Sequence, residues 1–150
     1  MPADNDMIKL YSGRILALAS DIPHLERLEN PMATVKRRSP LCGSAVTVDV
    51  VLEGDRISAF GQDVKACALG QAAAAVTGGA VIGRTLPEVI KARDELRAML
   101  KDNGPVPSAP FENFEVLEPA KDYKNRHASI LLSIEATCEA VEQALQSHCA

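Results

Sequence analysis

The chain has 150 residues and a formal net charge of −4, and this length predicts a single domain over residues 1–150 with a sizeable core. The acidic balance and the aromatic content of only 3% argue against a nucleic-acid partner, which needs basic surfaces and stacking rings. There is no apolar run long enough to span a membrane, and the N-terminal sequence is acidic rather than signal-like, so we expect a cytoplasmic protein without a membrane partner.

The first half of the chain predicts one helix followed by a β-hairpin. Apolar residues at helical spacing indicate a helix over 6–19, and the proline-containing segment after it predicts a loop with a short extended piece at 32–37. Apolar and polar residues then alternate over 45–64, which is the strongest strand signal in the chain. Gly54-Asp55 divides this stretch in the manner of a two-residue hairpin turn.

Two helices are predicted after the hairpin. An alanine-rich stretch begins at Cys67, and the pair Gly78-Gly79 predicts its end. A second helix begins after Thr85, because Glu88 stands three residues later in the arrangement of a capping box.

The last third of the chain predicts a connector and a long helix. Residues 101–119 are rich in proline and indicate a connector, whereas apolar residues recur at helical spacing over roughly 120–147. The predicted fold is therefore α+β, with a small antiparallel sheet of two to three strands and helices packed on one side.

Cys42 and Cys67 are the first candidates for chemistry. In a hairpin centred between Gly54 and Asp55, paired residue numbers sum to 109, and this register places the two cysteines opposite each other. Cys67 also stands at the predicted start of a helix, where free N–H groups favour a thiolate. Either cysteine alone is equally well explained as a small buried apolar residue. Together they predict a shared reactive or metal site.

Two thiolates do not complete a tetrahedral metal site, so other ligands are needed. His127 and Asp63 are candidates, although an ordinary surface or core histidine is the better explanation of His127, and a solvated charge at a strand end is the better explanation of Asp63. Cys138 follows His127 by about three helical turns, so we interpret it as a packing residue. There is no recognisable set of acid, base and nucleophile, and we do not expect an enzyme.

Three stretches carry a resemblance to a known family: "SPLCGSAVTVDVVLEGDRISAF", "KACALGQAAAAVTGG" and "NRHASILLSIEATCEAV". Together they resemble the NifU-like (IscU/SufU) iron–sulfur cluster assembly scaffolds, with the longer SufU-type spacing, and imply a SufE/NifU-like fold. Ser44 stands where the family has an aspartate, and Ala128 stands where it has a third cysteine.

The resemblance implies a scaffold that binds iron, a transient [2Fe–2S] iron–sulfur (Fe–S) cluster or zinc. The implied metal ligands are Cys42, Cys67 and His127, and the implied partners are a cysteine desulfurase and apo-protein cluster acceptors. Two alternatives stay open. One is a persulfide acceptor or redox thiol protein without metal, and the other is a degenerate scaffold that acts as a binding module.

Overall fold

In the computed structural model, residues 13–40 and 43–148 are described. Three strands, β1 (Ala33–Arg38), β2 (Ala45–Glu53) and β3 (Arg56–Lys65), form an antiparallel sheet in the order β1-β2-β3. The extended piece expected at 32–37 is β1. The sheet therefore has three strands, the larger of the two strand numbers that the sequence predicts.

The turn between β2 and β3 lies where the sequence predicts it. Glu53 pairs with Arg56 across Gly54 and Asp55. Gly54 has φ of 66°, a left-handed conformation that glycine adopts without the strain that a side chain would cause. Local turn chemistry therefore determines where the chain reverses.

A bulge between Val51 and Leu52 changes the register of this hairpin. From Val51 back to Ala45, the numbers of paired residues sum to 110 instead of 109. The expected register is therefore wrong beyond the bulge, and strand pairing does not place Cys67 opposite position 42. Any closeness of these two cysteines must come from the loop before β2.

Five described helical elements accompany the sheet, and their bounds differ in places from the prediction. They are α2 (Gly13–Ala19), α3 (Ala68–Ala80), α4 (Leu86–Lys101), the 3₁₀ helix η1 (Glu112–Asp122) and α5 (Lys124–His148). Residues 6–12 of the first predicted helix lie outside the described residues. The predicted connector at 101–119 is wrong in its second half, because η1 begins there and includes Pro119.

The two glycines Gly78 and Gly79 do not end α3, as the sequence analysis expected. The helix continues to Ala80. A Cβ atom at Gly78 would lie 2.8 Å from the side-chain nitrogen of Gln62 and 3.0 Å from the carbonyl oxygen of Pro23. Gly78 is therefore explained by close packing rather than by helix termination.

The start of α4 confirms the predicted capping box. The hydroxyl of Thr85 accepts from the backbone of Glu88, and the Glu88 carboxylate accepts from the Thr85 N–H at 3.0 Å. These bonds satisfy N–H groups that the first turn leaves free.

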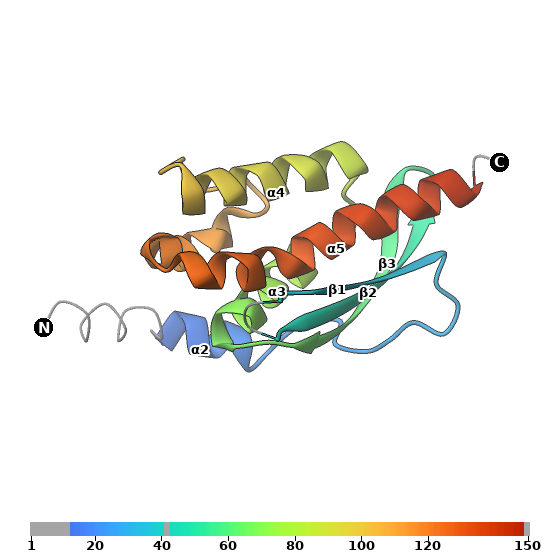
Figure 1. The fold of residues 1–150 in the computed structure, drawn as a ribbon. Coiled ribbons are helices and arrows are strands. Elements are labelled where there is room, and N and C mark those ends of the chain that lie inside the picture. Colours follow the sequence, from blue (N-terminus) through green and yellow to red (C-terminus); the bar gives the residue numbers. More distant parts are fainter. Residues whose placement is uncertain (1–12, 41–42, 149–150) are drawn as a thin grey trace, which may run out of the picture.

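Helices α3 and α5 pack on one face of the sheet, and α5 lies between α4 and the strands (Figure 1). Val46, Val48 and Val50 of β2 point toward these helices and are buried. Gln62 of β3 shares this face and donates to the Ala74 carbonyl at 3.0 Å. This arrangement confirms the predicted α+β fold with helices on one side.

The opposite face of β2 is covered by the segment that precedes β1. Asp49 is fully buried there and accepts hydrogen bonds from Arg27, Leu28 and Thr34. A Cβ atom at Gly61, which pairs with Asp49, would overlap the backbone of this segment. The sheet is therefore covered on both faces, by helices on one face and by the segment before β1 on the other.

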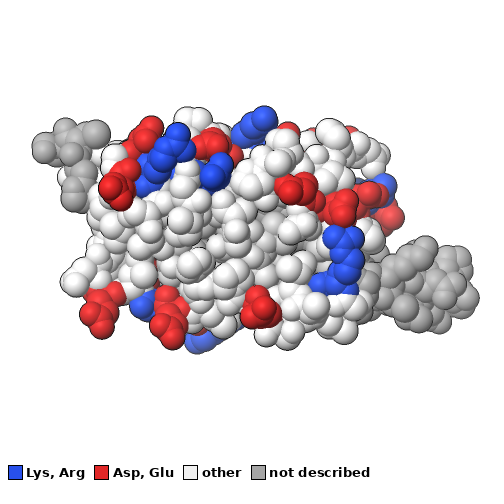
Figure 2. All heavy atoms as spheres, turned by 180° about the vertical axis from the view of Figure 1, so that it is seen from behind, with Lys and Arg blue, Asp and Glu red and all other residues white. Residues whose placement is uncertain are grey.

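Charged side chains on the reverse face lie toward its margins, where basic and acidic groups stand near one another and the middle is uncharged (Figure 2). This face offers no broad basic patch of the kind that nucleic acids need. Among the described residues, none of the helices has the length and apolar character required to cross a bilayer.

Candidate functional site

Cys67 occupies the junction between β3 and α3. β3 ends at Lys65, and Cys67 keeps an extended backbone (φ −66°, ψ 170°) before α3 begins at Ala68. Its side chain is half-buried and makes no regular capping hydrogen bond. The free N–H groups of the first helical turn therefore act on the sulfur through their dipoles.

The environment of Cys67 favours the thiolate. Burial raises the pKa of the Cys67 thiol, but the opposing influences are together larger, and the pKa lies below its ordinary value. These influences are the backbone N–H groups of Gly70 and Leu69, the hydroxyl of Ser129 and the positive charge of Arg126. The thiolate is the form of cysteine that binds metals and acts as a nucleophile.

A buried hydroxyl adjoins Cys67, and a second one is hydrogen-bonded to the first. Ser129 of α5 lies 3.6 Å from the Cys67 sulfur, measured from Oγ to Sγ, and 3.0 Å from the Ser44 Oγ. Ser44 immediately precedes β2, so the start of β2, the start of α3 and the first part of α5 meet at this point. Ser44 and Ser129 are only 3% and 1% exposed, and this isolation from water strengthens their hydrogen bonds.

Gly70 permits this meeting of α3 and α5. A Cβ atom at Gly70 would lie 2.7 Å from the Ser129 Oγ and 2.8 Å from the Ala66 Cβ. Any larger residue would therefore force Ser129 or the helix itself to move.

Cys42 lies outside the described residues, but backbone hydrogen bonds connect the residues on either side of it. The N–H of Ser39 donates to the Ser44 carbonyl at 2.8 Å, and the N–H of Gly43 donates to the Ser39 carbonyl at 3.0 Å. Gly43 has φ of 68°, which favours glycine. The described end of this loop, Ser44, is thus fixed beside Ser129.

His127 is buried near the start of α5, and its ring is held by backbone carbonyls. Its Nε2 lies 3.0 Å from the Ala120 oxygen and 3.1 Å from the Lys121 oxygen. Because carbonyls only accept, Nε2 is the ring nitrogen that donates to them. Residues two apart on a helix point about 200° apart, so His127 and Ser129 lie on opposite sides of α5.

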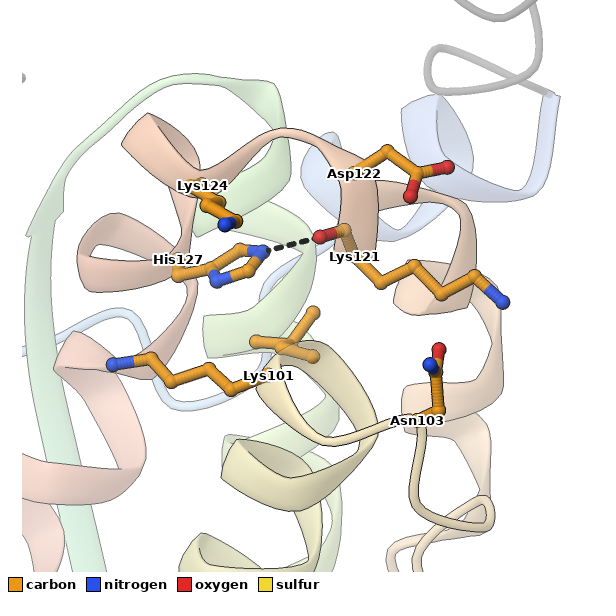
Figure 3. A pocket seen from close by; sticks show the side chains of 7 residues that line it. Lys101, Asn103, Lys121, Asp122, Lys124 and His127 are labelled. Atoms are coloured by element: carbon orange, nitrogen blue, oxygen red, sulfur yellow. Dashed lines mark hydrogen bonds between the residues drawn. The ribbon is translucent and has the colours of Figure 1, made fainter.

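The side of α5 that carries His127 borders a pocket (Figure 3). Its polar lining consists of Lys101, Asn103, Lys121, Asp122, Lys124 and His127. The ammonium groups of Lys101 and Lys121 point in opposite directions, and Lys121 pairs with Glu118 at 3.4 Å. The ammonium groups of Lys101 and Lys121 therefore do not converge on one point of the pocket.

The remaining sequence candidates lie elsewhere. Asp63 is exposed on β3 and acts electrostatically on Arg27, on the sheet face away from the helices. Cys138 is 2% exposed, and burial raises the pKa of its thiol to about 12, so the predicted packing role is confirmed. Among the described residues, which exclude Cys42, no three histidine, cysteine or acidic side chains gather as a metal centre.

Ser129 is the residue of this site that the sequence analysis missed. It follows Ala128, the position that the family resemblance singles out, and a buried serine in a helix carries no distinctive pattern. Only the meeting of three elements shows that its hydroxyl faces Cys67.

Comparisons with known proteins agree with this geometry. No protein-family model and no curated protein matches the chain. A solved nitrogen-fixing NifU-like protein (N-terminal) from Brucella abortus superposes with a TM-score of 0.91 and 40% identity, covering 94% of this chain and 98% of that chain. A putative iron–sulfur cluster assembly scaffold protein for the SUF system from Fervidobacterium islandicum AW-1 shares the fold, with a TM-score of 0.79 and 23% identity over 89% of this chain and 98% of that chain.

A relative 40% identical over nearly the full length of both chains is too similar for a shared fold alone. The chain belongs to the NifU-like (IscU/SufU) family.

Proposed function

We propose that this chain is an iron–sulfur cluster assembly scaffold that binds iron, a transient [2Fe–2S] cluster or zinc as cargo through Cys42, Cys67 and His127. Membership of the NifU-like family supports the scaffold role. Cysteine thiolates are the usual ligands of Fe–S clusters and of zinc.

The observation that carries the proposal is the placement of Cys67 beside the end of the loop that holds Cys42. Ser44 is linked to Cys67 through Ser129, at 3.0 Å and 3.6 Å. Along the chain, Cys42 precedes Ser44 by two residues, which span at most two Cα steps of about 3.8 Å each. The chain connection therefore limits how far Cys42 can lie from Ser44, and this limit, rather than the hairpin register, supports a site shared with Cys67.

His127 would enter the ligand set through a change in the first turn of α5. Its Nε2 is occupied by backbone carbonyls, so Nδ1 is the nitrogen that would ligate a metal, but the ring lies on the opposite side of the helix from Ser129. His127 is the fourth residue of α5, and the first turn of a helix opens more easily than its interior. We therefore propose that His127 joins the site when metal is bound.

The cargo chemistry implies the partners. A cysteine desulfurase would deliver sulfur to the site, and apo-protein acceptors would take the finished cluster. After it transfers the cluster, the chain itself would be chemically unchanged. None of its residues would act as a catalytic acid or base.

Metal loading of the anaerobic full-length chain tests the proposal. Zinc, or ferrous iron with sulfide, is added, and the bound metal is measured by elemental analysis together with the visible absorption spectrum. We expect stoichiometric loading of the native chain and its loss in Cys42→Ser and in Cys67→Ser. His127→Ala should weaken loading, whereas Cys138→Ser is the matched control and should load normally, since that thiol is buried.

Stoichiometric loading of a Cys42→Ser/Cys67→Ser double variant would refute the assignment of the site. Loading of His127→Ala with native affinity would remove His127 alone from the ligand set. These two outcomes are distinguishable because they arise in different variants.

A second function, persulfide acceptance, is favoured by one specific observation. Ser44, at the position of the family aspartate, is a buried hydroxyl bonded to Ser129 and offers no carboxylate to a metal. In this reaction the Cys67 thiolate attacks the terminal sulfur of a cysteine persulfide on the desulfurase. A new S–S bond forms at Cys67, the S–S bond of the desulfurase breaks, and its cysteine leaves as a thiolate.

Mass spectrometry after incubation with a cysteine desulfurase and free cysteine tests this second function. A mass increase of one sulfur on the Cys67 peptide, without prior metal loading, would support it. Failure of both this assay and metal loading would leave the chain as a binding module of the family fold.

A further inference from the structure

The two edge strands of the sheet, β1 and β3, differ in whether the rest of the chain covers their outer edges. The N–H of Ile57 in β3 donates to the Arg84 carbonyl at 3.0 Å, and the Ile57 carbonyl accepts from Gly83 at 2.8 Å. Further along the same edge, the N–H of Gln62 donates to the His24 carbonyl at 3.0 Å. The chain therefore supplies backbone partners of its own along the outer edge of β3.

The register of β1 shows which of its backbone groups point away from the sheet. Successive residues of an antiparallel strand direct their N–H and C=O groups alternately toward the paired strand and away from it. The N–H of Ser39 donates to the Ser44 carbonyl at 2.8 Å and continues the pairing of β1 with β2. The odd-numbered residues of β1 therefore bond to β2, whereas Thr34, Lys36 and Arg38 direct their backbone groups outward.

These outward backbone groups of Thr34, Lys36 and Arg38 form what we call the outer edge of β1. Within residues 13–40 and 43–148, no other group bonds to them, and all three residues are exposed. A row of unpaired backbone groups at a sheet edge is a template for a further strand. Many proteins bind an extended segment of a partner by adding it to such an edge.

Two cationic side chains flank the outer edge of β1. Residues two apart on a strand share a face, so Lys36 and Arg38 project about 7 Å apart from the face of the sheet opposite the helices. Neither side chain forms an ion pair with another described residue. Arg37 projects from the helix-facing side and pairs with Glu139 at 3.3 Å and with Glu135 at 3.9 Å, so its charge is already balanced. The uncompensated positive charge therefore lies on one face only.

This arrangement fits an extended segment with acidic side chains at alternate positions. In such a segment, every second side chain would lie beside Lys36 and Arg38, where opposite charges on neighbouring strands attract. The other side chains would lie on the helix side, toward Glu139, where further acidic groups would be repelled. A second copy of β1 fits poorly, because its own Lys36 and Arg38 would lie next to like charges. A nucleic acid has no strand backbone with which to pair.

We propose that the outer edge of β1 is a docking site for an extended, alternately acidic segment of a partner protein, which adds a fourth strand to the sheet. The inference goes beyond the proposed function, because it needs only the backbone of β1 and two cationic side chains. A use of this docking in cluster transfer rests on the proposed function. β1 leads into Ser39, which is bonded to Ser44, so the docked partner would lie beside the candidate site.

Amide hydrogen exchange of the full-length chain, followed by NMR, tests the docking. The probe is a peptide of about six residues, the length of an ordinary strand, that alternates glutamate and threonine. At saturation, the amides of Thr34, Lys36 and Arg38 should exchange about tenfold more slowly, because each gains a hydrogen bond. The amides of Val35 and Arg37 already bond to β2, and their exchange should change little.

Charge reversal tests whether the edge selects an acidic segment. Lys36→Glu and Arg38→Glu should each weaken binding of the peptide by about five- to tenfold, because an attractive pair becomes a repulsive one. Lys91→Glu is the matched control, since Lys91 is an exposed lysine on α4 rather than on the sheet. This variant should bind the peptide as the native chain does. A peptide that alternates lysine and threonine should bind the native chain less tightly than the acidic one.

Unchanged exchange at Thr34, Lys36 and Arg38 in excess peptide would overturn the proposal. The two cationic side chains would then only keep other strands away from an open edge. An equal loss of binding in Lys91→Glu would also overturn it, because the peptide would then be held by general charge attraction.

Metal loading and amide protection are separate measurements on the same chain. Protection of the outer edge of β1 in a chain that loads no metal would uphold the docking site and reject the scaffold role. Normal loading without protection would do the reverse.

Discussion

Replacing Asp49 by alanine tests whether one buried carboxylate fixes the segment before β1 onto the sheet. Asp49 is fully buried, and its oxygens accept from Arg27 Nε at 2.6 Å and from Arg27 Nη2 at 3.1 Å. They also accept from the Leu28 N–H at 3.0 Å and from the Thr34 hydroxyl at 2.6 Å. All of these donors lose their acceptor in Asp49→Ala.

The magnitude follows from what the substitution leaves behind. Breaking a buried ion pair costs about 3–5 kcal/mol when the remaining charge is stranded. Here the remaining partner is Arg27, whose side chain is 52% exposed and stays hydrated, so we expect a smaller loss. We place it at about 2–3 kcal/mol of unfolding free energy, or a melting temperature lower by about 4–12 °C.

The pH dependence gives a second signature. Burial raises the pKa of Asp49, but hydrogen bonds from Arg27, Thr34 and Leu28 and the charge of Arg27 together lower it below its ordinary range. A depressed folded pKa stabilises the fold above the unfolded pKa, and this contribution is lost as the pH falls through the folded value. The gap in stability between native chain and Asp49→Ala should therefore narrow below about pH 4.

Circular dichroism during thermal and urea unfolding, at neutral pH and at a series of acidic values, measures both signatures. Glu115→Gln is the control, since Glu115 pairs with Arg14 at 3.1 Å while both side chains are more than half exposed. Its stability should change by less than about 0.5 kcal/mol. Native stability of Asp49→Ala at neutral pH, or a gap that stays constant into acid, would refute the reasoning.

Three further predictions concern the helices. Gly70→Ala should lower the melting temperature, because its new Cβ would lie 2.7 Å from the Ser129 Oγ; an unchanged melting curve would contradict this packing. Thr85→Ala removes half of the capping box with Glu88 and should cost about 1 kcal/mol in urea unfolding, whereas a neutral effect would count against the cap. Cys138, with a pKa of about 12, should be labelled by iodoacetamide only in urea, and prompt labelling of the native chain would show that it is accessible.

The parts of the fold that could be predicted from sequence are those encoded within a few neighbouring residues. The capping box joins Thr85 to Glu88, and the hairpin turn depends on Gly54 and Asp55. The alternation of β2 likewise identifies its helix-facing valines. Each of these signals acts through a neighbour three or fewer positions away, so no tertiary information is needed.

The errors arise where packing with distant segments overrides local preference. The sequence predicts that Gly78 ends a helix. In the structure, Gly78 is needed because Gln62 and Pro23 lie too close for a larger side chain. The bulge at Val51/Leu52 contains no glycine or proline that would indicate it in the sequence. It shifts the register of the hairpin by one residue. Alternation also shows that Asp49 faces away from the helices, but not that another segment covers it.

For the candidate site, the sequence predicted the position of Cys67 at the start of a helix. The sequence singled out Cys67, and the structure places it at a helix start with a lowered thiol pKa, as a thiolate site requires. The roles proposed for Cys42, Cys67 and His127 all stay predictions. Ser129 could not be found, because its partners Ser44 and Cys67 lie 85 and 62 residues away along the chain.

The serine at position 44 has a physical consequence for the thiol beyond the loss of a metal ligand. A carboxylate in this buried position, one hydroxyl away from Cys67, would oppose a second negative charge on the sulfur and raise the pKa of the thiol. Only a bound cation would then balance the two charges. With Ser44 in place, this position carries a neutral hydroxyl that is hydrogen-bonded to Ser129 beside the Cys67 sulfur, so it adds no second negative charge near the thiol. We therefore expect that a thiolate at Cys67 needs no bound cation to offset a carboxylate at position 44.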